Sequence, residues 1–285
     1  MSPAVAPEPS APFGSWVGGQ ITPHAHCLLQ GNPGPMTLDG TNTWVLLAPG
    51  GTEAIVIDPG EDEPAHQQRV VDHVAEQGAR VSRIVLTHGH HDHSEGAPRL
   101  ARLTGAPVQA VGSGHDDLAD GDVLRAGDLE VRVVTTPGHT ADSISFALPA
   151  DHALLTGDTV LGRGTTVVAH PDGELAAYLD SLERIRDLTG QGDVTSILPG
   201  HGPTVPDAAA MVDFYRVHRR ERLDQVRQAL ADGARDAGEV VARVYADVDR
   251  SVWPAATMSV RAQMVYLEAW PTGVSGRGAG DARRR

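Results

Sequence analysis

Two histidines that could bind one metal ion stand near the middle of the chain. The segment Thr87–His93 reads Thr-His-Gly-His-His-Asp-His and directly follows a β-branched, apolar run at 83–86. In an extended loop, residues i and i+2 project to the same side, so His88 and His90 can bind one cation together. A solvated polar loop is the ordinary interpretation of a single histidine. It does not account for four potential ligands within six residues at a strand end.

The next residues of this segment can reach a second cation. Asp92 and His93 follow where the chain turns into a helix, beside the first pair. Imidazole together with a carboxylate suits zinc, and also iron or manganese. His91 is out of phase with its neighbours, and we predict that it is not a ligand. The segment therefore predicts a metal centre that holds more than one cation.

Three further ligand candidates stand at other strand ends. Residues 134–139 and 196–201 share one plan, in which a strand is followed by Pro-Gly and then by a histidine, His139 or His201. Proline closes the strand and glycine permits a sharp turn, so both histidines can point at a common site. Asp158 follows a short strand in the same manner.

In this order, the seven residues resemble the metal ligands of the metallo-β-lactamase-fold hydrolases. The resemblance implies an α/β (α+β) fold, a four-layer αββα sandwich with a two-zinc site at one edge. It implies that His88, His90 and His139 bind one metal, that Asp92, His93 and His201 bind the other, and that Asp158 bridges both. Asp58, in the turn Asp-Pro-Gly at 58–60, resembles an acid that supports the ligands from behind, although an ordinary turn aspartate is the alternative.

The chemistry implied is hydrolysis by a water shared between two zinc ions. The metals lower the pKa of this water, so that a hydroxide attacks at neutral pH. Asp92 orients the hydroxide and takes up its proton, which makes it the predicted catalytic residue. A protein nucleophile is not needed, and the sequence has no Gly-x-Ser-x-Gly turn.

Several loops extend the resemblance to a narrower group. The segments 32–38, 40–43 and 164–167 and the pair His218-Arg219 are similar to the lactamase-beta-2-like group. Members of that group carry a small winged-helix-like module, and the mitochondrial representative cleaves single-stranded RNA. Residues in or near these segments are the candidate substrate contacts, namely Asn42, Arg163, His170, Tyr178, His218 and Arg219.

The hydrophobic pattern predicts how the chain is organised. Short β-branched runs alternate with helical patterns as far as residue 206, which is typical of layered α/β folds, and three amphipathic helical patterns follow. Strands are expected at 43–47, 54–57, 83–86, 107–111, 129–134, 143–148, 153–155 and 195–198, and helices at 64–77, 95–104, 174–188, 207–231, 237–246 and 257–270. We predict a flexible N-terminal arm (1–15), a catalytic domain (16–206), a helical winged-helix-like module (207–271) and a disordered tail (272–285).

Composition excludes several classes of function. The 285 residues include no lysine, which excludes Schiff-base catalysis, a lysine general base and the lysine-dependent phosphate loop. Residues 1–206 hold 10 arginines and 26 acidic residues, a balance of −16, whereas residues 207–285 carry +2. Phosphate affinity comes mainly from cationic side chains, so an acidic domain such as residues 1–206 is a poor general binder of nucleic acid.

The location expected from the sequence is the cytoplasm. Cys27 is the single cysteine, so no internal disulfide can form, and a buried structural thiol is the expected role. The N-terminus has no basic start or apolar segment typical of a signal peptide, and no apolar run is long enough to span a membrane. The oligomeric state is left open, a homodimer included.

Three functions remain after these exclusions. The first is a phosphodiesterase acting on single-stranded RNA, with residues 218–222 contacting the phosphates, although this run also suits a solvated helix face. The second is a glyoxalase-II-like hydrolase of a small-molecule thioester or ester, for which Arg163 is the one loop arginine near the site. The third is a non-catalytic module that binds nucleic acid or protein. A true β-lactamase and a mononuclear iron oxygenase of the same fold are less favoured.

Overall fold

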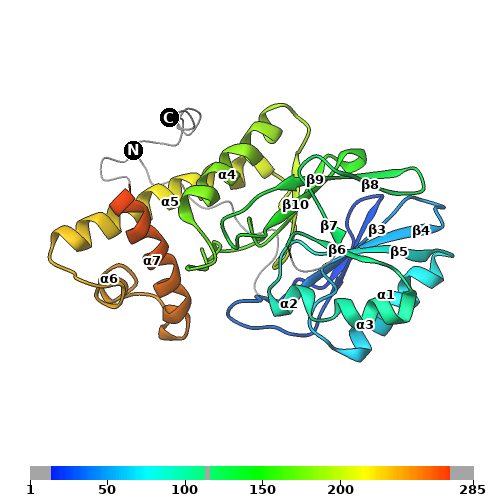
Figure 1. Ribbon diagram of the computed structural model, residues 1–285, viewed down its shortest axis with the longest axis horizontal. Helices are drawn as coiled ribbons and strands as arrows, with labels where there is room; N and C mark the ends of the chain where they lie inside the picture. Colours follow the sequence, from blue (N-terminus) through cyan, green and yellow to red (C-terminus); the bar gives the residue numbers. More distant parts are fainter. Residues whose placement is uncertain (1–13, 113–115, 270–285) are drawn as a thin grey trace.

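The computed structural model describes residues 14–112 and 116–269. Most of the predicted N-terminal arm and the whole predicted tail at 272–285 lie outside the described residues. In the described part, two β-sheets pack face to face and helices cover both outer faces (Figure 1). None of the helices described there is long and apolar enough to cross a membrane.

The first sheet has seven strands, which lie in chain order. They are β1 (Gly18–Gln20), β2 (Ala25–Leu29), β3 (Asn42–Leu47), β4 (Glu53–Ile57), β5 (Arg80–Val85), β6 (Val108–Ala110) and β7 (Asp116–Asp117). Strands β1 to β4 pair antiparallel, and β4 to β7 pair parallel. Helix α1 (Pro64–Glu76) provides the crossover from β4 to β5, and α3 (Ala97–Thr104) lies in the crossover from β5 to β6.

The second sheet has five strands and ends in one parallel pair. They are β8 (Val123–Ala126), β9 (Leu129–Thr135), β10 (Ile144–Leu148), β11 (Ala153–Gly157) and β12 (Ser196–Pro199). Strands β8 to β11 are antiparallel, whereas β12 runs parallel to β11 after the crossover helix α4 (Leu175–Gly190). Ligand-bearing loops therefore leave β9, β11 and β12 at one edge of the sandwich.

Alternating side chains produce the layers. In β4, Ile55 and Ile57 face the second sheet, whereas Ala54 and Val56 face α1 and α3. Both faces of the strand are buried, which explains why its sequence is continuously apolar. The outer face of the second sheet is covered by α4 and α5 (Ala208–Ala231), which completes the expected four-layer αββα sandwich.

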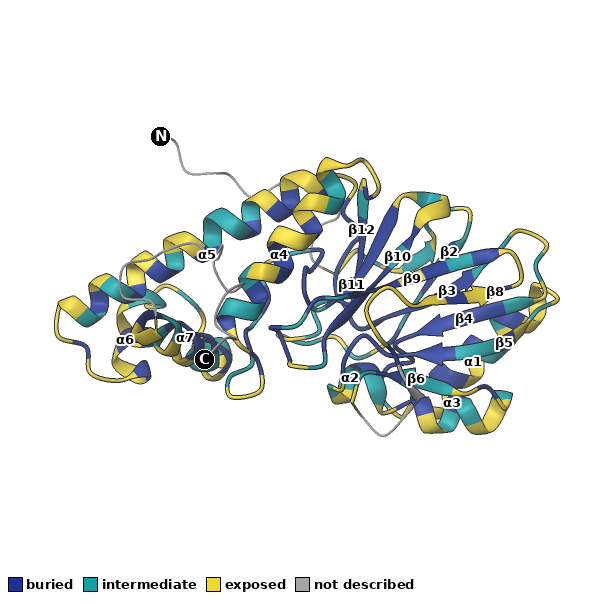
Figure 2. Cartoon of the chain, turned by 45° about the horizontal axis from the view of Figure 1, so that its top comes forward, coloured by how far each residue is buried: buried dark blue, intermediate teal, exposed yellow. Residues whose placement is uncertain are grey.

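The helices after residue 206 extend the sandwich to one side. Helix α5 is followed by α6 (Ala237–Val244), a short 3-10 turn (Arg250–Val252) and α7 (Trp253–Ala269). The buried faces of α5, α6 and α7 belong to the same apolar cluster as α4 and the outer face of the second sheet (Figure 2). The helical character expected for this part is confirmed, and its apolar core is continuous with that of the sandwich.

Sequence patterns located most elements within a few residues. Each of the eight strands and six helices expected from the pattern has a counterpart in the structure. Strands β1, β2, β7 and β8 were missed because they are short or lack an alternating β-branched pattern. Helix α7 begins at Trp253, four residues earlier than expected, because Pro254 occupies the first turn, where a missing N–H costs nothing.

Candidate metal centre

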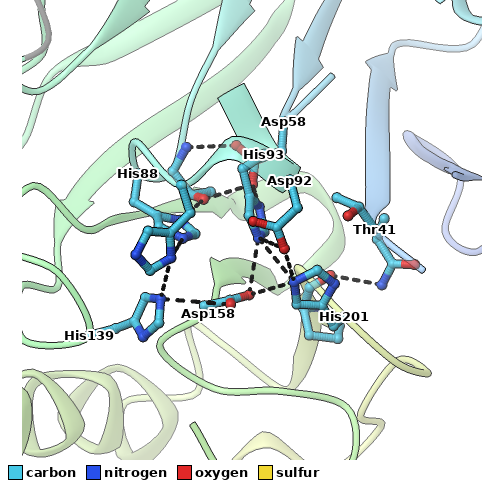
Figure 3. A network of polar contacts seen from close by, with 12 residues as sticks. Thr41, Asp58, His88, Asp92, His93, His139, Asp158 and His201 are labelled. Atoms are coloured by element: carbon cyan, nitrogen blue, oxygen red, sulfur yellow. Dashed lines mark hydrogen bonds and ion pairs between the residues drawn. The ribbon is translucent and has the colours of Figure 1, made fainter. Parts of the chain in front are cut away.

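All seven predicted ligands lie together at one edge of the two sheets. His88 and His90 follow β5, and Asp92 and His93 lie in the short helix α2 (His91–Ser94). His139, Asp158 and His201 follow β9, β11 and β12, respectively. Figure 3 shows Asp158 between the imidazoles of His88 and His139 on one side and Asp92, His93 and His201 on the other. Four chain segments, namely 88–93 and the turns that carry His139, Asp158 and His201, thus meet at one place.

Three histidines form the first ligand group. Nδ1 of His90 lies 3.1 Å from Nε2 of His88 and 3.1 Å from Nε2 of His139. His88 and His139 are almost fully buried. Burial together with the neighbouring imidazole of His93 holds the pKa of His88 well below its usual range. Its ring is therefore neutral and keeps a lone pair available for a cation.

Asp92, His93 and His201 form the second ligand group. Nε2 of His93 lies 3.1 Å from Nε2 of His201, and Oδ2 of Asp92 lies 3.2 Å from the latter. Burial acts to raise the pKa of Asp92, but the neighbouring imidazoles of His201 and His93 outweigh it and lower the pKa to about 2. Asp92 is therefore ionised, and 24% of its side chain is exposed, the most of any carboxylate in the two groups.

The two carboxylate oxygens of Asp158 face different ligand groups. Oδ1 lies 3.4 Å from Nε2 of His93 and 3.5 Å from Nε2 of His201, whereas Oδ2 lies 3.7 Å from Nε2 of His139. Burial opposes ionisation, but His201 and His93 hold the pKa of Asp158 well below its usual range. A carboxylate placed in this way can bridge two cations, whose mutual repulsion an anion reduces.

The donor set fits bound metal ions. Nitrogen atoms at 3.1 Å from one another match ligands that share one zinc ion, because Zn–N bonds of about 2.0–2.1 Å set tetrahedral ligands about 3.3 Å apart. Oδ1 of Asp158 is buried and makes no hydrogen bond with any described residue, which is costly unless another partner binds it. The same set of imidazoles and carboxylates also suits iron or manganese.

Hydrogen bonds on the far side of each ring fix the orientation of the ligands. Nδ1 of His139 donates to the carbonyl of Val167 at 2.6 Å, and Nδ1 of His201 donates to the carbonyl of Gly40 at 3.1 Å. Because a carbonyl can only accept, both rings carry their proton on Nδ1. Nε2, which faces the centre, is therefore bare and can bind a cation.

Asp58 supports the site from behind. Oδ2 of Asp58 accepts a hydrogen bond from Nδ1 of His93 at 2.9 Å, and the backbone and hydroxyl of Thr87 donate to the same carboxylate at 2.8 and 2.7 Å. Asp58 has a φ of +51°, in the left-handed region that a residue other than glycine rarely adopts. This strain is placed where a buried carboxylate orients a ligand, as expected for a functional position.

A histidine of α1 reaches Asp58 through Thr43. Arg69 can only donate, and it contacts Nδ1 of His66 at 2.8 Å, so Nδ1 carries no proton. Nε2 of His66 therefore donates to the hydroxyl of Thr43 at 2.8 Å, and Thr43 donates to the carbonyl of Asp58 at 2.7 Å. Burial, reinforced by the charge of Arg69, lowers the pKa of His66 to about 4. The chain of bonds requires the neutral ring.

We expect His66 to make folding sensitive to acid. Its folded pKa of about 4 lies below the unfolded value of 6.5, so its contribution is complete above pH 6.5 and is lost as the pH falls towards 4. The loss between pH 7.5 and 5 corresponds to about 2 kcal/mol. The free energy of unfolding can be measured with urea in the presence of a chelator. Between pH 7.5 and 5 it should fall by about 2 kcal/mol less in His66→Gln than in the parent protein. His152 is exposed, and His152→Asn is the control, which should show the pH dependence of the parent protein. Equal pH profiles for His66→Gln and the parent protein would contradict the role assigned to His66.

Gly138 allows the turn that presents His139. Its φ is +132°, and a Cβ at this position would lie 2.3 Å from the backbone N and Cα of Tyr178 in α4. Neither backbone can move without disturbing the sandwich. The Pro-Gly-His pattern therefore needs glycine here for space as well as for conformation.

We expect Gly138→Ala to lower the free energy of unfolding by more than about 3 kcal/mol, since it combines a backbone clash with left-handed strain. Gly192 is a matched control, with a φ of +80° and nothing within 4 Å of its Cβ position. Gly192→Ala should cost only about 1 kcal/mol, the cost of the conformation alone. Denaturant unfolding of both variants measures the difference, and equal losses would show that the contact with α4 is unimportant.

Three of the predicted substrate contacts are buried in the protein. The amide of Asn42 donates to the carbonyls of Pro199 and Gly202 at 2.9 Å each, so it supports the turn that carries His201. The hydroxyl of Tyr178 donates to the carbonyl of Thr159 at 2.7 Å. Arg219 is 3% exposed and donates to the carbonyl of Thr166. In this structure these side chains support loops of the metal centre from behind.

Three others are partly accessible. Arg163 pairs with the buried Asp39, with 2.6 Å between Nη2 and Oδ2. His170 is half-buried in the loop between β11 and α4, and His218 is half-buried on α5. Burial and the charges of Arg219 and Arg222 lower the pKa of His218 to about 4, so its ring is neutral. Neither histidine belongs to a ligand group among the described residues, and the same holds for the exposed His91.

Several contributors to the site left no signal in the sequence. The carbonyls of Gly40 and Val167 orient two ligands, but a backbone carbonyl is present at every position. Thr43 and Thr87 act through hydroxyls that many strand ends carry. The pattern Thr-His at 87–88, directly after a strand, could have singled out Thr87, whereas the others depend on the fold.

Comparisons with known proteins agree with this geometry. The sequence model of the Metallo-beta-lactamase superfamily matches residues 36–123 and 110–201. A Drosophila melanogaster protein named Beta-lactamase-like protein 2 homolog is 32% identical over 259 residues, covering 83% of this chain and 85% of that protein. An Aspergillus fumigatus protein named Atrochrysone carboxyl ACP thioesterase is 37% identical over 227 residues, covering 76% of this chain and 68% of that protein.

Solved structures share the fold. A beta-lactamase domain protein from Burkholderia ambifaria superposes with a TM-score of 0.72 at 24% identity, over 88% of each chain. ETHE1 from Myxococcus xanthus superposes with a TM-score of 0.58 at 27% identity, over 78% of this chain and 97% of that one. Family match, relatives and site geometry lead to one conclusion: the chain belongs to the metallo-β-lactamase superfamily of hydrolases.

Proposed function

We propose that this hydrolase holds two zinc ions and cleaves thioesters of an acyl group. The observation that carries the thioester is the 37% identity to a protein named as a carboxyl ACP thioesterase, over 76% of this chain. His88, His90 and His139 would hold one ion and Asp92, His93 and His201 the other, with Asp158 shared. Iron or manganese is the alternative that the donor set allows.

The residues of the chain have separate tasks in this reaction. Two bound zinc ions would supply a water of lowered pKa and stabilise negative charge on the acyl carbonyl oxygen. Asp92 is ionised and partly exposed, so Oδ2 can orient the attacking water and accept its proton. Asp58 keeps the proton of His93 on Nδ1. Thiolate is a good leaving group, so no further acid is required.

The arginines of α5 support a thioester over RNA. The sequence favoured single-stranded RNA because residues 218–222 could contact phosphates. Arg219 is buried, and Arg222 lies over the ring of Tyr245 at 4.6 Å and donates to Gln225. Arg219 and Arg222 are thus engaged within the protein, and of the three arginines at 219–222 only Arg220 is exposed. Phosphate affinity depends on such charges, which weighs against RNA.

A panel of substrates tests the proposal. Zinc-loaded protein is incubated with acyl-coenzyme A, an acyl group on an acyl carrier protein, acyl-glutathione, labelled single-stranded RNA and nitrocefin. Released thiol is measured with a chromogenic disulfide; Cys27 is 1% exposed and its thiol pKa is raised by burial, so it contributes little signal. We expect metal-dependent thiol release that Asp92→Ala abolishes.

The same panel can overturn the proposal. RNA cleavage without thiol release would restore the phosphodiesterase, and its rate should then fall steeply as salt rises. Turnover of nitrocefin alone would indicate a lactamase. Metal analysis that finds one iron per chain, in place of two zinc ions, would contradict the two-zinc assignment. Binding of a partner without turnover of any ester would contradict a catalytic role in thioester cleavage.

A further inference from the structure

The segment Thr166–Val168 touches two of the metal ligands. The hydroxyl of Thr166 donates to the backbone carbonyl of Asp158, and the carbonyl of Val167 accepts from Nδ1 of His139 at 2.6 Å. Asp158 lies between the two ligand groups, with Oδ1 near His93 and His201 and Oδ2 near His139, and His139 belongs to the first group. A shift of this segment would therefore move the bridging carboxylate and one imidazole together.

The opposite side of the same segment is held by the C-terminal helices. Nη2 of Arg219 in α5 donates to the carbonyl of Thr166. The backbone N–H of Val168 donates to the hydroxyl of Ser259 in α7 at 3.1 Å. Both contacts are buried, and they join positions 53 and 91 residues apart in the sequence. Three consecutive residues are thus fixed between two helices and the metal centre.

Arg219 is a costly residue to place at this position. The residue is 3% exposed, and its guanidinium makes no ion pair with a described carboxylate and lies 4.8 Å from the centroid of the Tyr178 ring. Burying a cation without an anionic partner is unfavourable, and cation–π contact with one ring offsets only part of the cost. A leucine or methionine would pack into the same apolar cluster more favourably. The hydrogen bond to Thr166 is what the arginine adds.

We propose that Arg219 and Ser259 are positioning residues of the metal centre, through which the C-terminal helices hold His139 and Asp158 in place. The effect should be larger at the first group, which loses the support of both His139 and Asp158, than at the second group, which shares only Asp158. His93 and His201 of the second group are oriented by Asp58 and by the carbonyl of Gly40. The C-terminal helices would then be a structural part of the first metal position, whatever else they bind.

Metal titration tests this inference without any substrate, so its outcome is separate from that of the proposed thioesterase. Metal-free Arg219→Met, Ser259→Ala and the double variant are titrated with Co²⁺ against a chromophoric chelator, and the visible spectrum is recorded. His139→Ala and His201→Ala identify which binding step belongs to which ligand group. We expect the step assigned to His139 to weaken on the order of 10-fold, as when the outer partner of a ligand is lost.

The step assigned to His201 should remain within about 3-fold of the parent protein. Arg219→Lys, which can still donate to Thr166, should lie between the parent and Arg219→Met. Arg261 of α7 is exposed, and Arg261→Ala removes a charge from the same helices as a control. It should change neither step.

Two results would overturn the inference. One is unchanged affinity of both steps in the double variant, and the other is equal weakening of both, which a general loss of folding would produce. Ser259→Ala removes a single hydroxyl, so it keeps the test decisive if Arg219→Met does not fold. Circular dichroism of each metal-free variant separates local from global effects.

Discussion

Asp158→Ala should abolish hydrolysis and release metal from both positions. Oδ1 of Asp158 lies near His93 and His201, and Oδ2 lies near His139, so one substitution removes a ligand from each group. Losing about 4 kcal/mol of charge stabilisation corresponds to about 1000-fold in kcat/KM. Zinc per chain after gel filtration, measured by elemental analysis, should fall below that of any variant in which a single histidine is replaced.

Asp193→Ala serves as the control for this change, because Asp193 is an exposed carboxylate in the turn between α4 and β12 and belongs to neither ligand group. It should retain the metal content and the rate of the parent protein. If Asp158→Ala keeps full metal content, the carboxylate is not shared between the two groups. The bridging role would then be wrong even if activity were lost.

Asp92→Asn should lower kcat while retaining much of the bound metal. The amide keeps the shape of the side chain and one oxygen donor, but it cannot accept a proton. Positioned proton transfer contributes roughly 100-fold to 10,000-fold, and we expect a loss of kcat in this range with little change in KM. Steady-state kinetics on the best thioester of the panel, together with metal analysis, make the measurement.

His91 provides the matched control, since it precedes Asp92 in α2 and is exposed. His91→Ala should change kcat by less than about 3-fold, in contrast to Asp92→Asn. A loss of metal from Asp92→Asn in proportion to its loss of rate would mean that Asp92 acts only as a ligand. The proton would then need another acceptor at the site.

Local patterns were enough to predict the elements that carry the ligands. Runs at 54–57 and 153–155 are apolar on both faces, and such runs in an α/β pattern form central strands. A Cβ at Gly138 or Gly200, in the two Pro-Gly-His turns, would clash with neighbouring atoms. The glycines themselves were the sequence signal for this lack of space. Strand β2, with Cys27 at its centre, carried no comparable pattern and was missed.

Substrate contacts were harder to predict, because exposure is a property of packing. Arg219 was expected to face RNA, since an arginine on an amphipathic helix is usually solvated, but it is buried against the ring of Tyr178 in α4 and the carbonyl of Thr166. Asn42 was expected to contact substrate, yet its amide donates hydrogen bonds to the carbonyls of Pro199 and Gly202, on either side of His201. Neither outcome could follow from residue type or spacing.

The sequence by itself determined the ligand types, their order and their places at strand ends, because local chemistry and strand period require only neighbouring residues. Tertiary structure decided which carbonyls fix each imidazole, that the oxygens of Asp158 separate towards the two groups, and that α5 and α7 contact the segment behind His139. These depend on distances between segments up to 161 residues apart, as for Gly40 and His201. Such distances are set only when the two sheets pack together.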